Sequence, residues 1–241
     1  MTRGAITVAW FSAGVSSAVA IKLVSREVDK IMYIHIGDQH EDTMRFVKDC
    51  ENWFGQKIEI LQSPYKTVEN ACRASAYING VRGASCTGLL KRRVRKDWER
   101  ANQDSEITYI WGMDKSEVHR PERLRETMPD QNHRCPLIEQ GIDKQAAHKT
   151  LNASGIKRPA MYELGYHNNN CVGCVKGGMG YFNRIRIDFP DIFNARARLE
   201  REIGASCING VYLDELAPDR GRHAPPIVDD CGILCEVDAI V

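Results

Sequence analysis

The chain has 241 residues, of which 43% are hydrophobic and 27% charged, a balance that excludes collagen-like, coiled-coil and wholly disordered proteins. Lys and Arg number 33 against 32 Asp and Glu, so the net charge of +1 argues against a uniformly basic nucleic-acid wrapper, although a local basic patch remains compatible with it. No apolar run approaches the roughly 18 residues of a membrane helix, and no signal-peptide pattern opens the chain. We therefore expect a cytoplasmic protein without membrane association.

The first half of the chain alternates short apolar runs with helical patterns. Residues 5–11 are almost continuously apolar, which is typical of a strand buried on both faces. Further strands are expected over residues 30–36, 58–61 and 107–111, and a helix over residues 43–54 that Gly55 caps. This order predicts an α/β fold with an open, mostly parallel twisted sheet and helices on both of its faces.

The second half is punctuated by prolines after about Arg120, and helices are expected over residues 143–153 and 191–203. We divide the chain into a domain over residues 1–165 and a loop-rich segment over residues 166–241. The second segment contains cysteines, and we expect it to pack on the first domain.

A loop of small and polar residues follows the first strand, at the sheet edge where open α/β folds bind ligands. Gly14 and its neighbours allow a ligand to approach the backbone, serine hydroxyls offer donors, and the next helix begins with free N–H groups. The loop lacks the Gly-Lys-Ser/Thr and Gly-x-Gly-x-x-Gly signatures. It is either a phosphate-binding loop or a tight turn of small residues. Its members are Ser12, Ala13, Gly14, Val15, Ser16 and Ser17.

The densest positive run is Lys91–Lys96. Leu90, Val94 and Trp98 recur every four residues, which predicts an amphipathic helix with the basic residues on its outer face. The run is either a solvated surface or an anion site for a nucleotide phosphate or a nucleic-acid backbone.

Arg120 belongs to a second positive group, together with Arg123 and Arg125. Arginine suits bidentate contacts with phosphate or sulfate. Glu117 is placed to pair with Arg120 and orient it, unless the two form a plain surface ion pair.

Nine cysteines in a cytosolic chain indicate metal, cluster or redox chemistry rather than disulfides. Cys171 and Cys174 lie on a tight turn, and Cys231 and Cys235 form a second close pair. Together they would complete a zinc or four-thiolate iron–sulfur site, with Cys86 or Cys135 as alternative ligands. Redox thiols, or no special role, remain open alternatives.

The other cysteines differ in their surroundings. Cys86 precedes Lys91 by five residues and is the best candidate for a free thiol activated by a nearby cation. Cys50, Cys72 and Cys207 are expected in the core.

His35 and Asp38 lie at or just beyond the end of the second strand, on the same sheet edge as the loop. They are placed to approach a ribose or an adenine. His35 is equally compatible with a buried core histidine.

Several motifs in this order carry a family resemblance between about Val8 and Phe193. They are Ser-Ala-Gly-Val-Ser-Ser at 12–17, Gly37-Asp38 with Glu41-Asp42-Thr43, Cys86-Thr87 with Lys91, Gly112 with Glu117 and Arg120, Pro136-Leu137-Ile138, and Asn169-Asn170-Cys171-Val172-Gly173-Cys174. The chain resembles the phosphoadenosine-phosphosulfate (PAPS) reductase family. This family belongs to the PP-loop, N-type ATP pyrophosphatase (adenine nucleotide alpha hydrolase-like) superfamily and includes phage-encoded and DNA-phosphorothioation-associated members.

The resemblance implies an adenine nucleotide, ATP or PAPS/APS. Its contacts would come from the residue 12–17 loop with His35, Asp38 and Gly112, and the catalytic residues would be Cys86, Lys91 and Arg120. Two departures from the family pattern matter. Ser16 replaces the PP-loop aspartate, and the Cys-Gly-Leu-His tail of the reductases is missing, since the segment around Cys231 and Cys235 is only loosely similar.

Two chemistries follow from the resemblance. In the favoured one, ATP with magnesium adenylylates an acceptor, nucleic acid among the candidates, and sulfur from a thiol or cluster then displaces AMP. In the alternative, a cysteine attacks the sulfur of bound PAPS or APS, a thiol reductant completes the reaction, and sulfite leaves. A third possibility is a nucleotide sensor or partner subunit without turnover. Relatives are often homodimers.

Overall fold

The structure is a computed structural model that describes residues 4–81 and 83–222. The described residues divide into two compact units. The sheet unit holds those of Met1–Ile34, Glu41–Leu61 and Arg95–Pro159, and the cysteine unit holds those of His35–His40, Gln62–Val94 and Ala160–Val241. The units interleave along the chain, whereas the sequence suggests a single cut near residue 165. That domain boundary stays a prediction.

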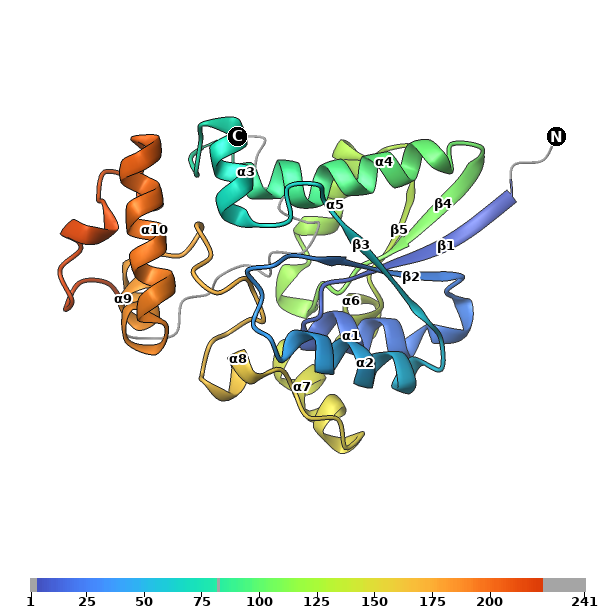
Figure 1. The fold of residues 1–241 in the computed structure, drawn as a ribbon. Helices are drawn as coiled ribbons and strands as arrows, with labels where there is room; N and C mark the ends of the chain where they lie inside the picture. Colours follow the sequence, from blue (N-terminus) through green and yellow to red (C-terminus); the bar gives the residue numbers. More distant parts are fainter. Residues whose placement is uncertain (1–3, 82, 223–241) are drawn as a thin grey trace. The chain divides into compact units, whose positions relative to one another are not determined.

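A five-stranded sheet forms the centre of the sheet unit (Figure 1). Its strands are β1 (Gly4–Phe11), β2 (Lys30–His35), β3 (Ile58–Gln62), β4 (Ser105–Ile110) and β5 (Asn132–Arg134), in the spatial order β3-β2-β1-β4-β5. The β1–β2, β1–β4 and β4–β5 pairs are parallel. The predicted open parallel α/β sheet is therefore confirmed. The order reverses beside β1, so the carboxyl end of β1 is the switch point at which such sheets bind ligands.

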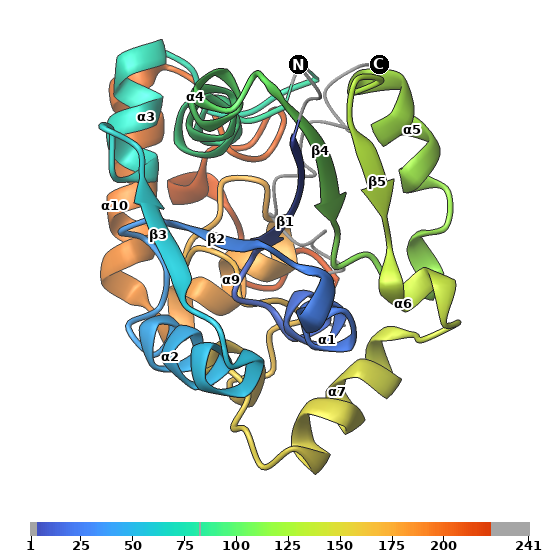
Figure 2. The same ribbon diagram turned by 90° about the vertical axis from the view of Figure 1, so that its right-hand side faces the viewer.

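Neighbouring residues of β1 show that helices cover both faces of this sheet. The Trp10 ring contacts Trp98 of α4 (Arg93–Ala101) with ring centroids 6.0 Å apart. The next residue, Phe11, points to the opposite face, where its ring lies 6.1 Å from Phe46 and 5.7 Å from Phe54 of α2 (Thr43–Phe54). Figure 2 shows α1 (Val15–Leu23) on the same face as α2.

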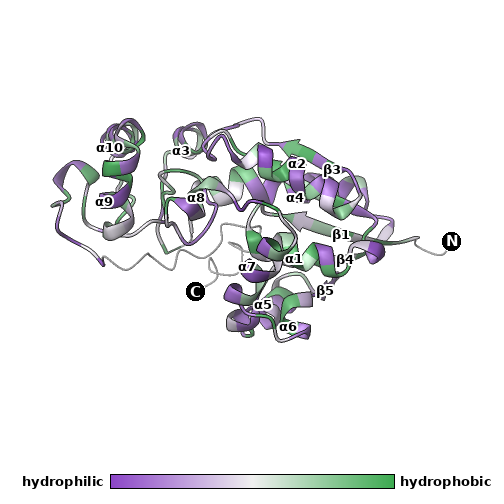
Figure 3. Ribbon diagram, turned by 90° about the horizontal axis from the view of Figure 1, so that it is seen from below, coloured by the Kyte–Doolittle hydropathy of each residue, from purple (hydrophilic) through white to green (hydrophobic). Residues whose placement is uncertain are grey.

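The remaining helices of the sheet unit are α5 (Arg120–Thr127), α6 (Pro136–Glu139) and α7 (Lys144–Ala153). The predicted helix over residues 43–54 is confirmed, with Gly55 in the left-handed conformation at φ 70° as its cap. The α2 ribbon carries both hydrophobic and hydrophilic stretches in Figure 3, and its buried residues, Phe46, Val47, Cys50 and Phe54 among them, recur at helical spacing. The predicted helix over residues 143–153 is also confirmed, and the Asp143 side chain accepts a hydrogen bond from the Ala146 N–H.

The basic run differs from its prediction in two ways. A π-helix, η2 (Thr87–Arg92), precedes α4, so the segment is not one regular α-helix. Arg95 is buried at 2% exposure instead of lying on the outer face. It pairs with Glu99 and donates to the Met128 sulfur at 2.9 Å, so a specific partner offsets the cost of removing its charge from water.

The cysteine unit contains α3 (Val68–Ser75), η2, α8 (Ala160–Glu163), α9 (Met179–Asp188) and α10 (Pro190–Ile203). The last of these confirms the predicted helix over residues 191–203. Glu200 of α10 is fully buried, and its two carboxylate oxygens accept the Cys207 and Leu213 N–H groups at 2.6 Å each. Among the described residues, no helix has the length and apolar character required to cross a bilayer.

A half-buried histidine, His133, gives the sheet unit a predictable pH dependence. His133 of β5 accepts a hydrogen bond from Trp111 Nε1 at Nδ1 (3.0 Å), so its neutral form donates from Nε2 to the Met128 carbonyl (2.9 Å). Burial lowers the pKa of His133 below its usual value of 6.5. Its neutral form therefore stabilises the fold above the unfolded pKa, and this contribution is lost as the pH falls through the folded pKa.

We expect His133→Gln, which keeps one acceptor and one donor, to flatten the loss of stability between about pH 7.5 and pH 5. Urea unfolding at both pH values measures the difference. The matched control is His119→Gln at an exposed position, which should leave the pH dependence unchanged. Equal slopes for wild type and His133→Gln would contradict the assignment.

Candidate functional site

The residue 12–17 loop joins the carboxyl end of β1 to α1. Ala13 has φ 58°, a left-handed conformation that costs a residue with a side chain roughly 1–2 kcal/mol. Gly14 stands at the N-cap of α1 and has no side chain to take up the N–H groups of the first turn. The positive end of the helix dipole is therefore presented by backbone alone, as in anion-binding helix starts.

Serine hydroxyls hold this loop in shape. Ser17 donates to the Gly14 carbonyl at 2.9 Å, so Ser12 is the donor in the 2.8 Å bond between the two hydroxyls. The Ser12 N–H also donates to Ser17 Oγ at 3.3 Å. Ser16 and Ser17 are buried, while Ser12 is half-buried. The loop is thus organised by its own hydrogen bonds, and the Ser17 hydroxyl bonds to Ser12 and Gly14 of the same loop.

Gly112, just after β4, is brought against this loop. A Cβ at position 112 would lie 2.5 Å from Ser17 Cα and 2.8 Å from Ser17 N. The sequence placed Gly112 among the nucleotide contacts, and the structure places it directly behind the loop. Only glycine allows this approach without displacing backbone.

Arg120 begins α5 and is 4% exposed. It forms an ion pair with Glu117, which confirms the predicted pairing and excludes the alternative of a plain surface pair. Burial raises the pKa of Glu117, with Arg120 opposing this shift. Glu117 also accepts the Asp114 N–H at 3.1 Å, so the carboxylate that orients Arg120 is itself fixed.

His35 and Asp38 belong to the cysteine unit. His35 is half-buried at the end of β2. The Asp38 side chain connects α3 and α10, since one carboxylate oxygen accepts the Val68 N–H at 2.7 Å and the other accepts a hydrogen bond from Arg196. The contacts predicted between these residues and a ribose or adenine stay predictions.

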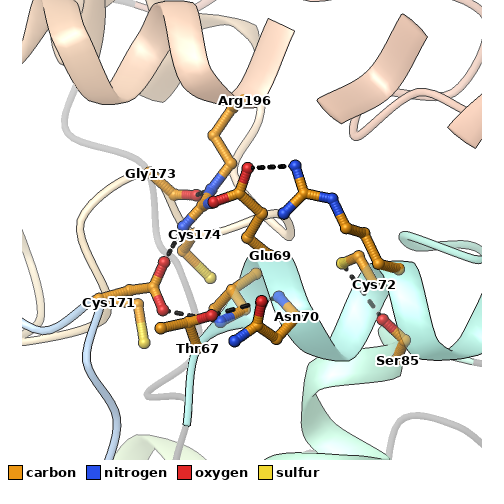
Figure 4. A network of polar contacts seen from close by, with 12 residues as sticks. Thr67, Glu69, Asn70, Cys72, Ser85, Cys171, Gly173, Cys174 and Arg196 are labelled. Atoms are coloured by element: carbon orange, nitrogen blue, oxygen red, sulfur yellow. Dashed lines mark hydrogen bonds and ion pairs between the residues drawn. The ribbon is translucent and has the colours of Figure 1, made fainter. Parts of the chain in front are cut away.

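The Cys171–Cys174 turn is tightly built and buried (Figure 4). Gly173 has φ 68°, and a Cβ there would lie 2.7 Å from Ile192 Cγ2 of α10. The Gly173 carbonyl accepts a hydrogen bond from Arg196 Nε at 3.0 Å. The sequence predicted a tight turn, and the structure confirms it.

The Tyr181 hydroxyl of α9 bridges the two ends of the same turn. This hydroxyl donates to the Cys171 carbonyl at 3.2 Å and accepts the Cys174 N–H at 3.0 Å. Burial raises the pKa of Tyr181 well above its usual range, so the hydroxyl keeps its proton as this pattern requires. Gly177 makes room for the ring, because a Cβ there would lie 2.0 Å from Tyr181 Cδ1.

Cys86 is the N-cap of η2 and Lys91 lies within η2, in the same unit as the turn. Both are half-buried. Burial raises the pKa of the Cys171 thiol to about 12, the positive charge of Lys91 opposes this shift, and the charges of Asp38 and Cys86 add to it. Cys86 and Lys91 therefore act electrostatically on Cys171, and a π-helix is a feature often found at functional sites.

The structure describes only some of the predicted metal ligands. Cys135 lies in the sheet unit, where burial raises its thiol pKa to about 12. Within residues 4–81 and 83–222, no group of three or more His, Cys, Asp or Glu side chains is placed to hold a metal ion. Cys231 and Cys235 lie outside the described residues. Cys50, Cys72 and Cys207 are buried, as expected.

Arg196 and Tyr181 are the site-building residues that the sequence did not indicate. An arginine within an Arg-rich helix has no local signal of burial, and a tyrosine after a Gly-rich stretch has none of hydrogen bonding. The separation of 158 positions between Arg196 and Asp38 places their pairing beyond any periodicity argument.

Three comparisons relate the chain to known proteins. The family model for the phosphoadenosine phosphosulfate reductase domain matches residues 6–177. An uncharacterized protein of Methanocaldococcus jannaschii is 23% identical over 207 residues, which are 80% of this chain but only 41% of that protein. A crystal structure of PAPS reductase from Candida auris, in a phosphate complex, aligns with a TM-score of 0.47 and 14% identity over 66% of this chain and 78% of that chain.

The matched region begins in β1 and ends just after the Cys171–Cys174 turn, so it takes in the residue 12–17 loop, Gly112 and Arg120. Placement among phage-encoded or phosphorothioation-associated members stays a prediction. Because the family model covers well over half of its length, the chain belongs to the phosphoadenosine phosphosulfate reductase domain family.

Proposed function

We propose that the chain binds an adenine nucleotide with its phosphates at the residue 12–17 loop and uses it in sulfur chemistry. The observation that carries this proposal is the loop itself. A left-handed Ala13, an N-cap at Gly14 without a side chain and a glycine packed behind Ser17 together give the loop a compact shape with little side-chain bulk around its backbone. Family membership supplies the adenine nucleotide as the anion.

The favoured reaction is ATP-dependent activation of an acceptor followed by sulfur transfer. Backbone N–H groups at the start of α1 would polarise the phosphate under attack, as donors fixed in advance do in other phosphate sites. Arg120, held by Glu117, would add a positive charge that needs no reorganisation. Pyrophosphate leaves on activation and AMP on sulfur transfer, with magnesium as the expected counter-ion. Nucleic acid, small molecule and protein remain candidate acceptors.

The second candidate is reduction of PAPS or APS, favoured by the buried thiols of the cysteine unit. In that reaction a cysteine sulfur bonds to the sulfonate sulfur and the nucleotide phosphate leaves. A second thiol then forms a disulfide with the first, and sulfite is released. Cys86 is half-buried, whereas Cys171 is buried and burial raises its pKa. Cys86 is therefore the more accessible nucleophile.

The two described cysteines of the turn do not by themselves complete a tetrahedral thiolate site. Zinc or an iron–sulfur cluster would need further ligands, and the predicted ones, Cys231 and Cys235, lie outside the described residues. Metal analysis and a visible spectrum of anaerobically purified protein test this part of the proposal. No step of the reaction is assigned to a metal or a cluster.

One assay separates the candidate functions. The full chain is incubated with ATP, magnesium and candidate acceptors while pyrophosphate is measured, and in parallel with PAPS and a dithiol while sulfite is measured. Pyrophosphate release supports activation, and sulfite release supports reduction. Tight ATP binding with neither product supports a sensor or partner subunit, which the replacement of the loop aspartate by Ser16 motivates.

Bulky substitutions in the loop test the binding site. We expect Ser12→Leu and Gly14→Val each to weaken ATP binding more than tenfold, or about 1.4 kcal/mol, because their side chains occupy the space of the phosphate. Isothermal titration calorimetry measures the affinity. Gly4→Val is the matched control, since no atom lies within 4 Å of a Cβ at that exposed position. Unchanged affinity in both loop variants would refute the site.

A further inference from the structure

His133 of β5 lies between two elements of the sheet unit that carry residues of the proposed nucleotide site. Its Nδ1 accepts the Trp111 Nε1–H at 3.0 Å, and Trp111 is directly followed by Gly112. Its Nε2 donates to the Met128 carbonyl at 2.9 Å, and Met128 is the C-cap of α5, the helix that begins at Arg120. Figure 2 shows α5 beside β5, in agreement with these contacts. One imidazole thus joins the end of β4 to the end of α5.

The strand β5 is a short edge strand, so its position depends on specific contacts. Its three residues, Asn132–Arg134, include no apolar side chain, and an apolar face therefore does not fix its register. The Trp111 N–H donates to the Arg134 carbonyl at 2.9 Å. Trp111, which is 2% exposed, is thus bonded to β5 through both its backbone and its indole. The indole bond to His133 is a directional contact at the point where β4 ends.

The contacts continue from Trp111 to the residue 12–17 loop. A Cβ at Gly112 would lie 2.5 Å from Ser17 Cα, so the backbone that follows β4 packs closely behind the loop. The Ser17 hydroxyl in turn donates to the Gly14 carbonyl at 2.9 Å. Close-packed interiors transmit a displacement instead of absorbing it. The position of the Trp111 indole therefore affects the shape of the loop.

The surroundings of His133 favour its neutral form. Burial lowers the pKa of His133, the hydrogen bond to the α5 carbonyl opposes this shift, and the positive charges of Arg125 in α5 and Arg95 in α4 add to it. Tyr109 of β4 stacks on the ring with centroids 6.2 Å apart, and its hydroxyl donates to Glu99 at 2.6 Å. The Glu99 carboxylate also pairs with Arg95. The neutral imidazole is the form that keeps both of its hydrogen bonds.

We propose that His133 and Trp111 are positioning residues of the nucleotide site, and that a proton on His133 Nδ1 weakens nucleotide binding because it releases the Trp111 indole. The inference rests on the proposed nucleotide site at the residue 12–17 loop. An imidazolium carries N–H groups on both ring nitrogens, so it has no acceptor for the indole N–H. Nucleotide affinity is therefore fully present where the ring is neutral and falls as the pH decreases. By linkage, a bound nucleotide favours the neutral ring to the same extent.

The pH dependence of ATP binding tests this coupling. Calorimetry on the full chain measures ATP affinity at about pH 7.5 and about pH 5.5 for wild type and for His133→Gln, whose amide keeps one acceptor and one donor without titrating. ATP itself titrates in this range, and the comparison of the two proteins cancels that contribution. We expect the affinity of wild type to fall about fivefold more than that of His133→Gln. His119→Gln, at an exposed position, is the matched control and should keep the wild-type pH dependence.

Proton release on binding is a readout that a purely structural role would not change. Calorimetry of ATP binding at the lower pH, in two buffers with different ionisation enthalpies, counts the protons that are released. We expect wild type to release more protons than His133→Gln, because the bound nucleotide favours the neutral ring of His133. Equal pH dependence and equal proton release in the two proteins would overturn the coupling.

Trp111→Phe tests the other partner, since it removes the indole N–H and keeps an aromatic ring. We expect weaker ATP binding than in wild type at the higher pH, and a pH dependence like that of His133→Gln, because the imidazole then has no indole to release. A folded Trp111→Phe variant with the wild-type affinity and pH dependence would overturn the positioning role. If this variant fails to fold, the comparison of wild type with His133→Gln decides the proposal.

The loop variant Gly14→Val separates a failure of this inference from a failure of the proposed function. ATP binding that Gly14→Val weakens, together with equal pH dependence in wild type and His133→Gln, would overturn the coupling alone. ATP binding that Gly14→Val leaves unchanged, or a wild-type chain that does not bind ATP, would overturn the nucleotide site and the coupling with it.

Discussion

Gly112→Ala is expected to abolish nucleotide binding and to lower the stability of the sheet unit. The new Cβ would lie 2.5 Å from Ser17 Cα and 2.8 Å from Ser17 N, and neither of these backbone atoms can move alone. Overpacking of this kind costs about 1–3 kcal/mol, which for a chain of this size is about 2–4 °C of melting temperature per kcal/mol. A displaced Ser17 also loses its bond to the Gly14 carbonyl, so the loop loses its shape.

Thermal unfolding and ATP calorimetry on the same preparation measure both effects. We expect more than a tenfold loss of affinity, about 1.4 kcal/mol. Gly4→Ala is the matched control within the sheet unit, because a Cβ there meets no atom within 4 Å. Wild-type ATP affinity in a folded Gly112→Ala variant would show that the nucleotide binds elsewhere.

Gly173→Ala is expected to disrupt the Cys171–Cys174 turn through two separate costs. The left-handed φ of 68° is unfavourable for alanine by about 1–2 kcal/mol. In addition, the Cβ would lie 2.7 Å from Ile192 Cγ2. We therefore expect the free energy of unfolding to fall by more than about 2 kcal/mol, together with faster alkylation of Cys171 and Cys174.

Two further variants separate these costs. Gly210→Ala has a similar φ of 75° with no atom within 4 Å of the new Cβ, so it reports the conformational cost alone. Ile192→Leu removes the Cγ2 methyl group, so combining it with Gly173→Ala should recover the steric part. Denaturant unfolding measures the free energies, and mass spectrometry measures the alkylation. Equal losses in Gly173→Ala and Gly210→Ala would show that α10 does not constrain the turn.

The half-buried His133 and the buried Glu200 have pKa values that are shifted in opposite directions. The pKa of His133 is lowered by burial, so its neutral form stabilises the fold above the unfolded pKa. The pKa of Glu200 is raised, again with burial as the leading cause, so its contribution to stability is greatest below 4.5 and is lost as the pH rises through the folded pKa. In both residues the neutral form is the one that the interior favours.

Local patterns in the sequence were sufficient for four strands of the sheet, for α2 with its Gly55 cap, and for the position of the residue 12–17 loop. These features depend on which face a residue presents and on which residues tolerate a tight turn. Both properties repeat over a few positions and can be seen in a short window. The short strand β5 was missed, because its three residues, Asn132–Arg134, include no apolar side chain.

Only the tertiary structure decided which charged residues are buried. Arg95, Arg120 and Arg196 look alike in the sequence, since each stands among other charged residues on a helix, yet each is buried against a specific carboxylate. The partner of Arg196 lies 158 positions away, and the two compact units take alternating stretches of the chain. Charge burial depends on partners brought together by folding, which no local period encodes. The sequence by itself thus determined four strands of the sheet and the position of the residue 12–17 loop, and the fold alone assembled the support around the two cysteines.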